Sequence, residues 1–100
     1  MTFDEHVTSA LDALPADIAR RLENVAIVVE DEHADEPDLL GLFEGGGEFM
    51  PDKVTIYRLP LEADFPDPVE LEREIRVTVL HELGHYFGLD EGRLEELGYE

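Results

Sequence analysis

Apolar residues near the start of the chain recur every three to four positions, the period of an α-helix. Residues 3–13 form the first such segment, with Thr2 before it and Glu5 three positions later, a pattern typical of a capped helix start. Pro15 suits the first turn of a second helix over residues 15–23. The apolar side of that helix is expected to consist of Ile18, Ala19 and Leu22.

Three apolar segments in the middle of the chain lack this period and are rich in strand-forming residues. Residues 25–30, VAIVVE, predict a strand that is buried on both faces. Residues 39–43, LLGLF, predict a short strand that the following glycines end, and residues 53–59, KVTIYRL, predict another. The acidic segment 31–38 is expected to be a loop, and the proline-containing segment 60–68 is expected to lack regular structure.

The helical period returns over residues 68–87, where one narrow stripe is polar and the rest is apolar. On a wheel of 3.6 residues per turn, the stripe contains His81, His85, Thr78 and Glu74, with Glu82 at its edge. The apolar side contains Ile75, Val79, Leu80, Leu83, Tyr86 and Phe87. A surface helix would show a broad polar face, so this helix is expected to be mostly buried.

A last short helix is expected over residues 90–97, so helices flank the predicted strands on both sides in the sequence. This order indicates the α+β class with a small sheet. The chain has 100 residues, of which 43% are hydrophobic, and this suffices for one domain with a modest core. We expect that domain to cover residues 1–100.

Charge is the unusual property of the composition. Aspartate and glutamate total 26, lysine and arginine total 7, and the net charge is −19. Phosphate backbones and anionic membrane surfaces would repel such a chain, so neither nucleic acid nor membrane is an expected partner. Cysteine is absent, which excludes disulfides and thiolate metal sites. Together with the lack of a signal-peptide pattern, this favours a cytoplasmic location. A halophilic source and a GC-rich genome explain the acidity equally well.

The polar stripe carries the sequence HELGH at residues 81–85. Histidines at positions i and i+4 of a helix lie one turn apart on one face, so both can reach one metal ion at about 2 Å. The glutamate between them is rotated by about 100° and can accept a proton from a water bound to that metal. This is the H-E-x-x-H arrangement of zinc peptidases. We therefore predict His81 and His85 as Zn²⁺ ligands and Glu82 as the catalytic base.

The motif continues as H-E-x-x-H-x-x-G-x-x-E through Gly88 and Glu91. Gly88 can adopt the left-handed conformation that ends a helix and turns the chain back. That turn would bring Glu91 to the metal as the third ligand and leave the fourth position open for water. Asp90 is the alternative third ligand, although it is also well placed to cap the last helix.

The extended motif resembles the metzincin signature, with Glu91 in place of that group's third histidine. The chain more closely resembles a family of very small bacterial zincin-like metallopeptidases over VAIVVED, DLLGLFEG, PDKVTIYRLPLE and VTVLHELGHYFGLDEGRLEELGY. The family pattern is H-E-x-x-H-x-x-G-x-x-D followed by R-L-x-E-L-G. It is matched at His81, Glu82, His85, Gly88, Arg93, Leu94, Glu96, Leu97 and Gly98, and Glu91 replaces its aspartate. The resemblance implies a minimal zincin fold, in which a small mixed sheet packs on the motif helix.

Several other side chains have candidate roles at such a site. Glu74 and Thr78 can orient a ligand histidine from outside the metal shell, although Glu74 is equally typical of a solvated acid. Tyr57, Arg58 and Tyr86 can polarise a substrate carbonyl, but the core is the favoured interpretation for both tyrosines. His6 and His33 have no metal-ligand spacing and are expected at the surface.

The favoured function is that of a zinc-dependent peptidase whose peptide or protein substrate adds to an exposed strand edge at residues 39–43, kept accessible by flexible glycines at 45–47. The alternative is a non-catalytic zincin-like metal-binding or interaction module. About 100 residues leave little room for a second lobe around a cleft, which supports this alternative. A third hypothesis is a structural domain that binds no metal.

Overall fold

The computed structural model describes the backbone of residues 1–87 and the side chains of residues 1–84. Its elements in chain order are α1 (Phe3–Asp12), α2 (Ala16–Leu22), β1 (Val25–Glu30), β2 (Gly41–Glu44), β3 (Asp52–Tyr57), α3 (Arg58–Asp64) and α4 (Pro68–Phe87). The strands form one mixed sheet in the order β1-β3-β2, in which β1 runs parallel and β2 antiparallel to β3. The architecture is α+β, as the sequence predicts.

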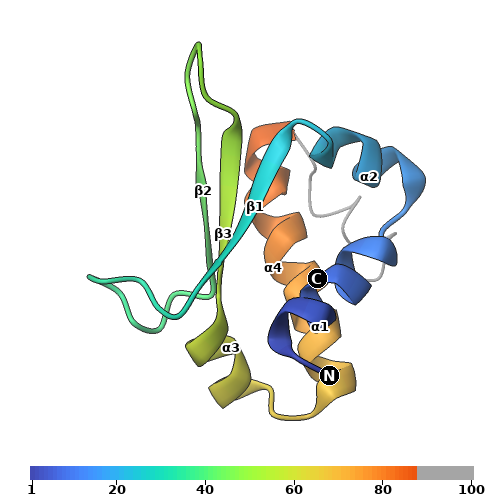
Figure 1. Cartoon of the computed structure of the whole chain (residues 1–100), viewed down its shortest axis with the longest axis vertical. Coiled ribbons are helices and arrows are strands. Elements are labelled where there is room, and N and C mark those ends of the chain that lie inside the picture. Colours follow the sequence, from blue (N-terminus) through green and yellow to red (C-terminus); the bar gives the residue numbers. More distant parts are fainter. Residues whose placement is uncertain (88–100) are drawn as a thin grey trace.

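Helices α1, α2 and α4 lie on one side of the sheet, and the hairpin of β2 and β3 projects beyond them (Figure 1). Helix α4 packs against β2 and β3 with its apolar side. The centre of this contact consists of Val54 and Ile56 from β3 with Ile75, Val79 and Leu83 from α4, all at most 1% exposed. Helix α1 completes the same core with Phe3, Val7 and Ala10, and Ile18 of α2 packs near Leu80 of α4.

Helix α1 begins as predicted. The Glu5 amide donates to Thr2 Oγ1 at 3.2 Å, and the Thr2 amide donates to Glu5 Oε1 at 3.1 Å, which completes a capping box. The helix is then joined to α4 by Glu72, whose carboxylate contacts His6 Nδ1 at 2.7 Å and accepts from Ser9 Oγ at 3.2 Å. His6 is half-buried in this contact, so its predicted place at the surface is wrong.

The segment after β3 differs from the prediction. Strand β3 ends at Tyr57, and Arg58 begins α3 where residues 60–68 were expected to lack regular structure. Pro60 is the third residue of this helix, and a first turn tolerates proline because the amide it lacks would have no helical partner there. Pro60 and Leu61 are buried, so tertiary packing supports a helix that the local sequence does not favour.

Strand β1 is less buried than predicted. Val25 is buried, residues 26–29 are half-buried and Glu30 is exposed. The reason is that β1 is an outer strand with one neighbour. In α2, Ile18 is buried as predicted but Ala19 is exposed. The helix predicted over residues 90–97 lies outside the described residues. In the described part, no helix is both long enough and apolar enough to cross a membrane.

The link between α1 and α4 predicts a pH dependence of stability. The hydrogen bond from His6 is the largest cause that lowers the pKa of Glu72 below its ordinary 4.5, and Ser9 lowers it further. Since the folded pKa is lowered, this stabilisation is fully present above pH 4.5 and is lost as the pH falls through the folded value. Glu72→Gln should therefore reduce the free energy of unfolding at neutral pH and make little difference in acid.

Urea unfolding of both proteins between about pH 7 and about pH 3 measures this difference. Glu48→Gln is the control, because Glu48 is exposed in the loop between β2 and β3. A deficit in Glu72→Gln that stays constant across the whole pH range would contradict the assignment.

Candidate functional site

Helix α4 contains the whole HELGH sequence within one unbroken helix. The chain enters it through Asp67, whose Oδ2 accepts from the Glu70 amide at 3.0 Å, and through Pro68, a residue suited to the first helical position. Near the motif, the buried side of α4 includes Leu80 and Leu83, as predicted, while the polar stripe shows an exposed His81 and a half-buried Glu82.

Glu82 reaches the edge of the sheet. Its Oε1 accepts a hydrogen bond from the Phe43 amide of β2 at 2.9 Å. Along an antiparallel strand, the backbone groups of successive residues point in turn towards the partner strand and away from it. The carbonyl of Leu40, just before β2, points towards β3, because it accepts from the Tyr57 amide at 3.0 Å. Phe43 is three residues later, an odd number, so its backbone groups have the opposite direction. The Phe43 amide therefore points away from β3. The carboxylate of Glu82, the second residue of the motif, therefore lies at the outer edge of β2.

Gly41 allows β2 to approach α4 this closely. A Cβ atom at this position would lie 2.5 Å from Thr78 Cγ2, 3.3 Å from the Thr55 carbonyl oxygen and 3.7 Å from Glu82 Cγ. Thr78 cannot rotate away freely, because its hydroxyl donates to the Glu74 carbonyl at 2.8 Å. Strand β2 thus lies directly on the turn of α4 that precedes the motif.

The predicted metal ligands are only partly within the described residues. His81 and His85 lie one turn apart on the same continuous helix, and the His85 side chain is outside the description. Gly88, Asp90 and Glu91 are also outside it, so the choice between the two acids as third ligand stays a prediction. Among the residues with described side chains, no three histidine, cysteine, aspartate or glutamate residues are close enough to hold a metal.

The other candidates mostly have structural roles. Tyr57 is 3% exposed, and burial, followed by the charges of Glu30 and Glu44, raises its pKa, which supports the core interpretation. Arg58 pairs with Asp31 at 2.9 Å and with Glu62 at 2.7 Å, so its charge is already neutralised. The side chain of Tyr86 is outside the description.

The two remaining members of the polar stripe also have partners within α4. The Thr78 hydroxyl donates its hydrogen bond to the Glu74 carbonyl, so it cannot also donate to a histidine and orient that ring. The Glu74 carboxylate accepts from Arg73 at 3.2 Å. These contacts favour a solvated, ion-paired Glu74 over a role beside the metal.

His33 organises the acidic loop between β1 and β2. Its Nδ1 accepts from the amides of Asp35 and Glu36, each at 3.1 Å. Its ring meets Tyr57 edge-on, with 5.8 Å between the ring centres. His33 is half-buried rather than a plain surface residue, and the loop that it holds contains no helix or strand, as predicted.

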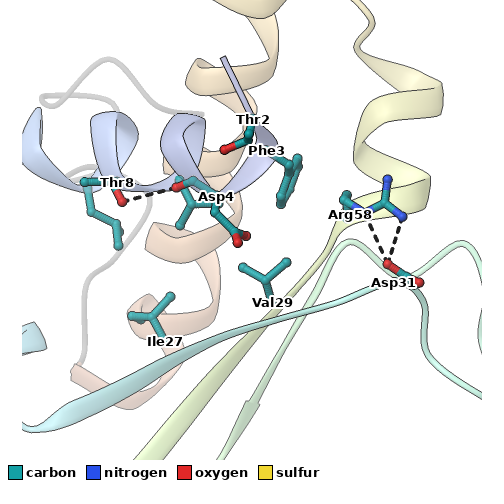
Figure 2. A pocket seen from close by; sticks show the side chains of 10 residues that line it. Thr2, Phe3, Asp4, Thr8, Ile27, Val29, Asp31 and Arg58 are labelled. Carbon is teal, nitrogen blue, oxygen red and sulfur yellow. Dashed lines mark hydrogen bonds and ion pairs between the residues drawn. The ribbon is translucent and has the colours of Figure 1, made fainter.

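A cleft of about 730 Å³ lies between α1 and β1 (Figure 2). Its apolar lining includes Ile27 and Val29 of β1, which lie across the cleft from Phe3 of α1, while the ion pair of Arg58 and Asp31 lies at one end. Among the described side chains of α4, residues 68–84, none lines it. The hydroxyl of Thr8 donates to the Asp4 carbonyl within its own helix. Among the described residues of the cleft, the Thr8 hydroxyl is therefore not paired with a basic side chain, and the motif on α4 is the better candidate site.

Two parts of the site were not predicted from the sequence. One is the Phe43 amide, and backbone groups carry no signal in the sequence. The other is the close approach at Gly41, for which a signal exists, because a glycine inside an apolar strand often marks close contact with another backbone. Gly46, in the loop after β2, is a second close approach: a Cβ atom there would overlap the Pro51 backbone, and the Gly46 amide donates to Asp52 Oδ1 at 3.1 Å.

Comparison with known proteins now identifies the class. A family model described as zincin-like metallopeptidase matches residues 22–99. The chain therefore belongs to the zincin-like metallopeptidase family, as its resemblance to that group implies. The matched region includes the whole sheet, α3 and the motif helix, whereas α1 precedes it. No curated protein matches the chain.

The contact at Gly41 predicts a specific pair of variants. Gly41→Ala should destabilise the fold by about 1–3 kcal/mol, because the added methyl group overlaps Thr78 Cγ2 and the Thr55 backbone. Thr78→Ser removes Cγ2 and keeps the hydroxyl, so it should recover most of this loss in the double variant. Thermal or urea unfolding of the four proteins measures the coupling. Equal destabilisation by Gly41→Ala in both backgrounds would show that the two residues do not meet.

Proposed function

We propose that the chain is a zinc-dependent peptidase, with His81, His85 and Glu91 as metal ligands and Glu82 as the general base. The observation that carries this proposal is the position of Glu82. Glu82 is half-buried, its carboxylate lies on the outer edge of β2, 2.9 Å from the Phe43 amide, and the exposed His81 directly precedes it on α4. A base, a metal-ligand type of side chain and a strand edge therefore occur at one place.

The residues present fit a zinc ion. A continuous helix holds two histidines one turn apart, and the exposed imidazole of His81 is open to an ion from solvent. Glu91 follows at the spacing that completes a three-ligand site. When bound, zinc supplies a positive charge that makes a neighbouring water more acidic and polarises a carbonyl group.

The protein groups supply binding and proton transfer. Strand β2 is an outer strand, so an extended peptide can add to it through backbone hydrogen bonds. A peptide added in this way would bring one of its peptide bonds beside α4. Glu82 can then take a proton from a water molecule and deliver it to the leaving amine, because its carboxylate lies on that side of the helix. The substrate class is an extended segment of peptide or protein.

One observation favours the second candidate, a non-catalytic zincin-like module. The Glu82 carboxylate accepts from the Phe43 amide, so it also fastens β2 to α4. A protein without activity could keep this glutamate for that contact alone. The two candidates can be distinguished by a variant of Glu82 that loses the negative charge but keeps the hydrogen bond to Phe43. Such a variant loses peptide cleavage if the protein is a peptidase, and it has no cleavage to lose if the protein is a non-catalytic module.

The metal assignment predicts about one Zn²⁺ per chain after dialysis against micromolar zinc, measured by elemental analysis. A double variant, His81→Ala with His85→Ala, should lose it. Glu91→Ala should weaken zinc affinity more than Asp90→Ala does. The reverse order would move the third ligand to Asp90, and full zinc content in the double variant would remove the site from α4.

The catalytic assignment predicts a separable effect of Glu82→Gln. The glutamine oxygen can still accept from the Phe43 amide, but it cannot take a proton. Cleavage of casein should fall by about 10²- to 10⁴-fold at unchanged zinc content and an unchanged or higher melting temperature. A wild-type protein that binds zinc but cleaves neither casein nor a broad peptide mixture would instead support the non-catalytic module.

A further inference from the structure

The Phe43 amide is the group that an added peptide strand would need. Strand β2 forms the outer edge of the sheet, and this amide points away from β3. A strand that adds to such an edge pairs one of its carbonyl oxygens with an outward amide. In the structure the acceptor is Oε1 of Glu82, at 2.9 Å. A carboxylate oxygen of the protein itself stands where the carbonyl oxygen of a bound peptide would lie.

We propose that the Phe43 amide changes partner when substrate binds: in the free protein it holds Glu82, and an extended peptide paired with β2 takes the amide and releases the carboxylate. This deepens the proposed function, because the released carboxylate is the general base. The exchange of acceptors itself requires only an extended peptide. The site therefore selects segments whose backbone carbonyls are free, which helices and the central strands of sheets do not offer.

The surroundings of Glu82 allow this exchange without movement of the backbone. Gly41 and Thr78 fix the distance between β2 and α4, because a Cβ atom at position 41 would lie only 2.5 Å from Thr78 Cγ2. The Cγ atom of Glu82 lies near Gly41, and a Cβ atom at position 41 would be 3.7 Å from it. Glu82 is half-buried rather than fully enclosed, so water can solvate its charge once the amide is taken. Rotation of one side chain is sufficient to exchange the acceptor.

Amide hydrogen exchange of Phe43 in ¹⁵N-labelled, zinc-free protein tests the first half of the proposal. Without zinc no cleavage interferes. The amide should exchange slowly in the wild type and in Glu82→Gln, which keeps an acceptor oxygen. In Glu82→Ala it should exchange at least roughly tenfold faster. Equal exchange in wild type and Glu82→Ala would overturn the proposal.

Peptide affinity tests the second half. The probe is a blocked, uncharged hexapeptide rich in valine and threonine, titrated to millimolar concentration into zinc-free protein. Glu82→Ala should bind it roughly three- to tenfold more tightly than the wild type, because the competing acceptor is absent. The bound peptide should also slow Phe43 exchange again in that variant. Weaker binding by Glu82→Ala, or no effect of the peptide on Phe43 in either protein, would overturn the proposal.

A matched pair of variants isolates the amide. Phe43→Pro removes the N–H, which does not take part in the β2–β3 ladder, and edge strands tolerate such a proline. Phe43→Ala removes the side chain and keeps the amide. Only the proline variant should lose peptide binding, and circular dichroism checks that both fold. If either fails to fold, the comparison of Glu82→Ala with the wild type still decides.

The two proposals fail separately. Peptide-dependent exchange at Phe43 without any zinc-dependent cleavage would refute the peptidase and leave the change of partner standing. If cleavage depends on Glu82 but neither Glu82→Ala nor peptide alters the exchange of the Phe43 amide, the peptidase proposal stands and the change of partner is refuted.

Discussion

The burial of α4 is the constraint on which the described structure depends. Helices α1 and α3 and strands β2 and β3 all pack against it, and Leu80 extends the contact towards Ile18 of α2. Around the motif, where residues 77–80 and Leu83 are buried, the side chains of His81 and Glu82 lie on the narrow stripe that the neighbours of α4 leave open. The stripe ends at the edge of β2, so the place available for chemistry is decided by packing.

That constraint explains which described features around the motif the sequence predicts. The boundaries of α4 follow from its apolar spacing and from Pro68, and the grouping of His81 with Glu82 follows from the period of the helix. Both depend on local geometry that repeats along the chain. The strands follow equally well from their β-branched residues, to within one or two residues at their ends.

The features that the sequence does not predict arise between segments far apart in the chain. The bond of Phe43 to Glu82 joins positions 39 residues apart, and one partner is a backbone amide. His6 meets Glu72 across 66 residues, and an isolated histidine gives no indication of its partner. Helix α3 is missed for a different reason. Pro60 is typical of a helix breaker, but the burial of Pro60 and Leu61 outweighs this local propensity. Each requires knowledge of which surfaces meet.

The contact of Gly41 with Thr78 has a consequence for how this sequence can change over time. Neither position can be altered alone without penalty, because the space that one residue leaves empty is filled by a methyl group of the other. Descendants of the chain can therefore acquire a side chain at position 41 most readily after position 78 has become smaller. The order of such changes is set by geometry, and the two positions should drift as a linked pair although 37 residues separate them.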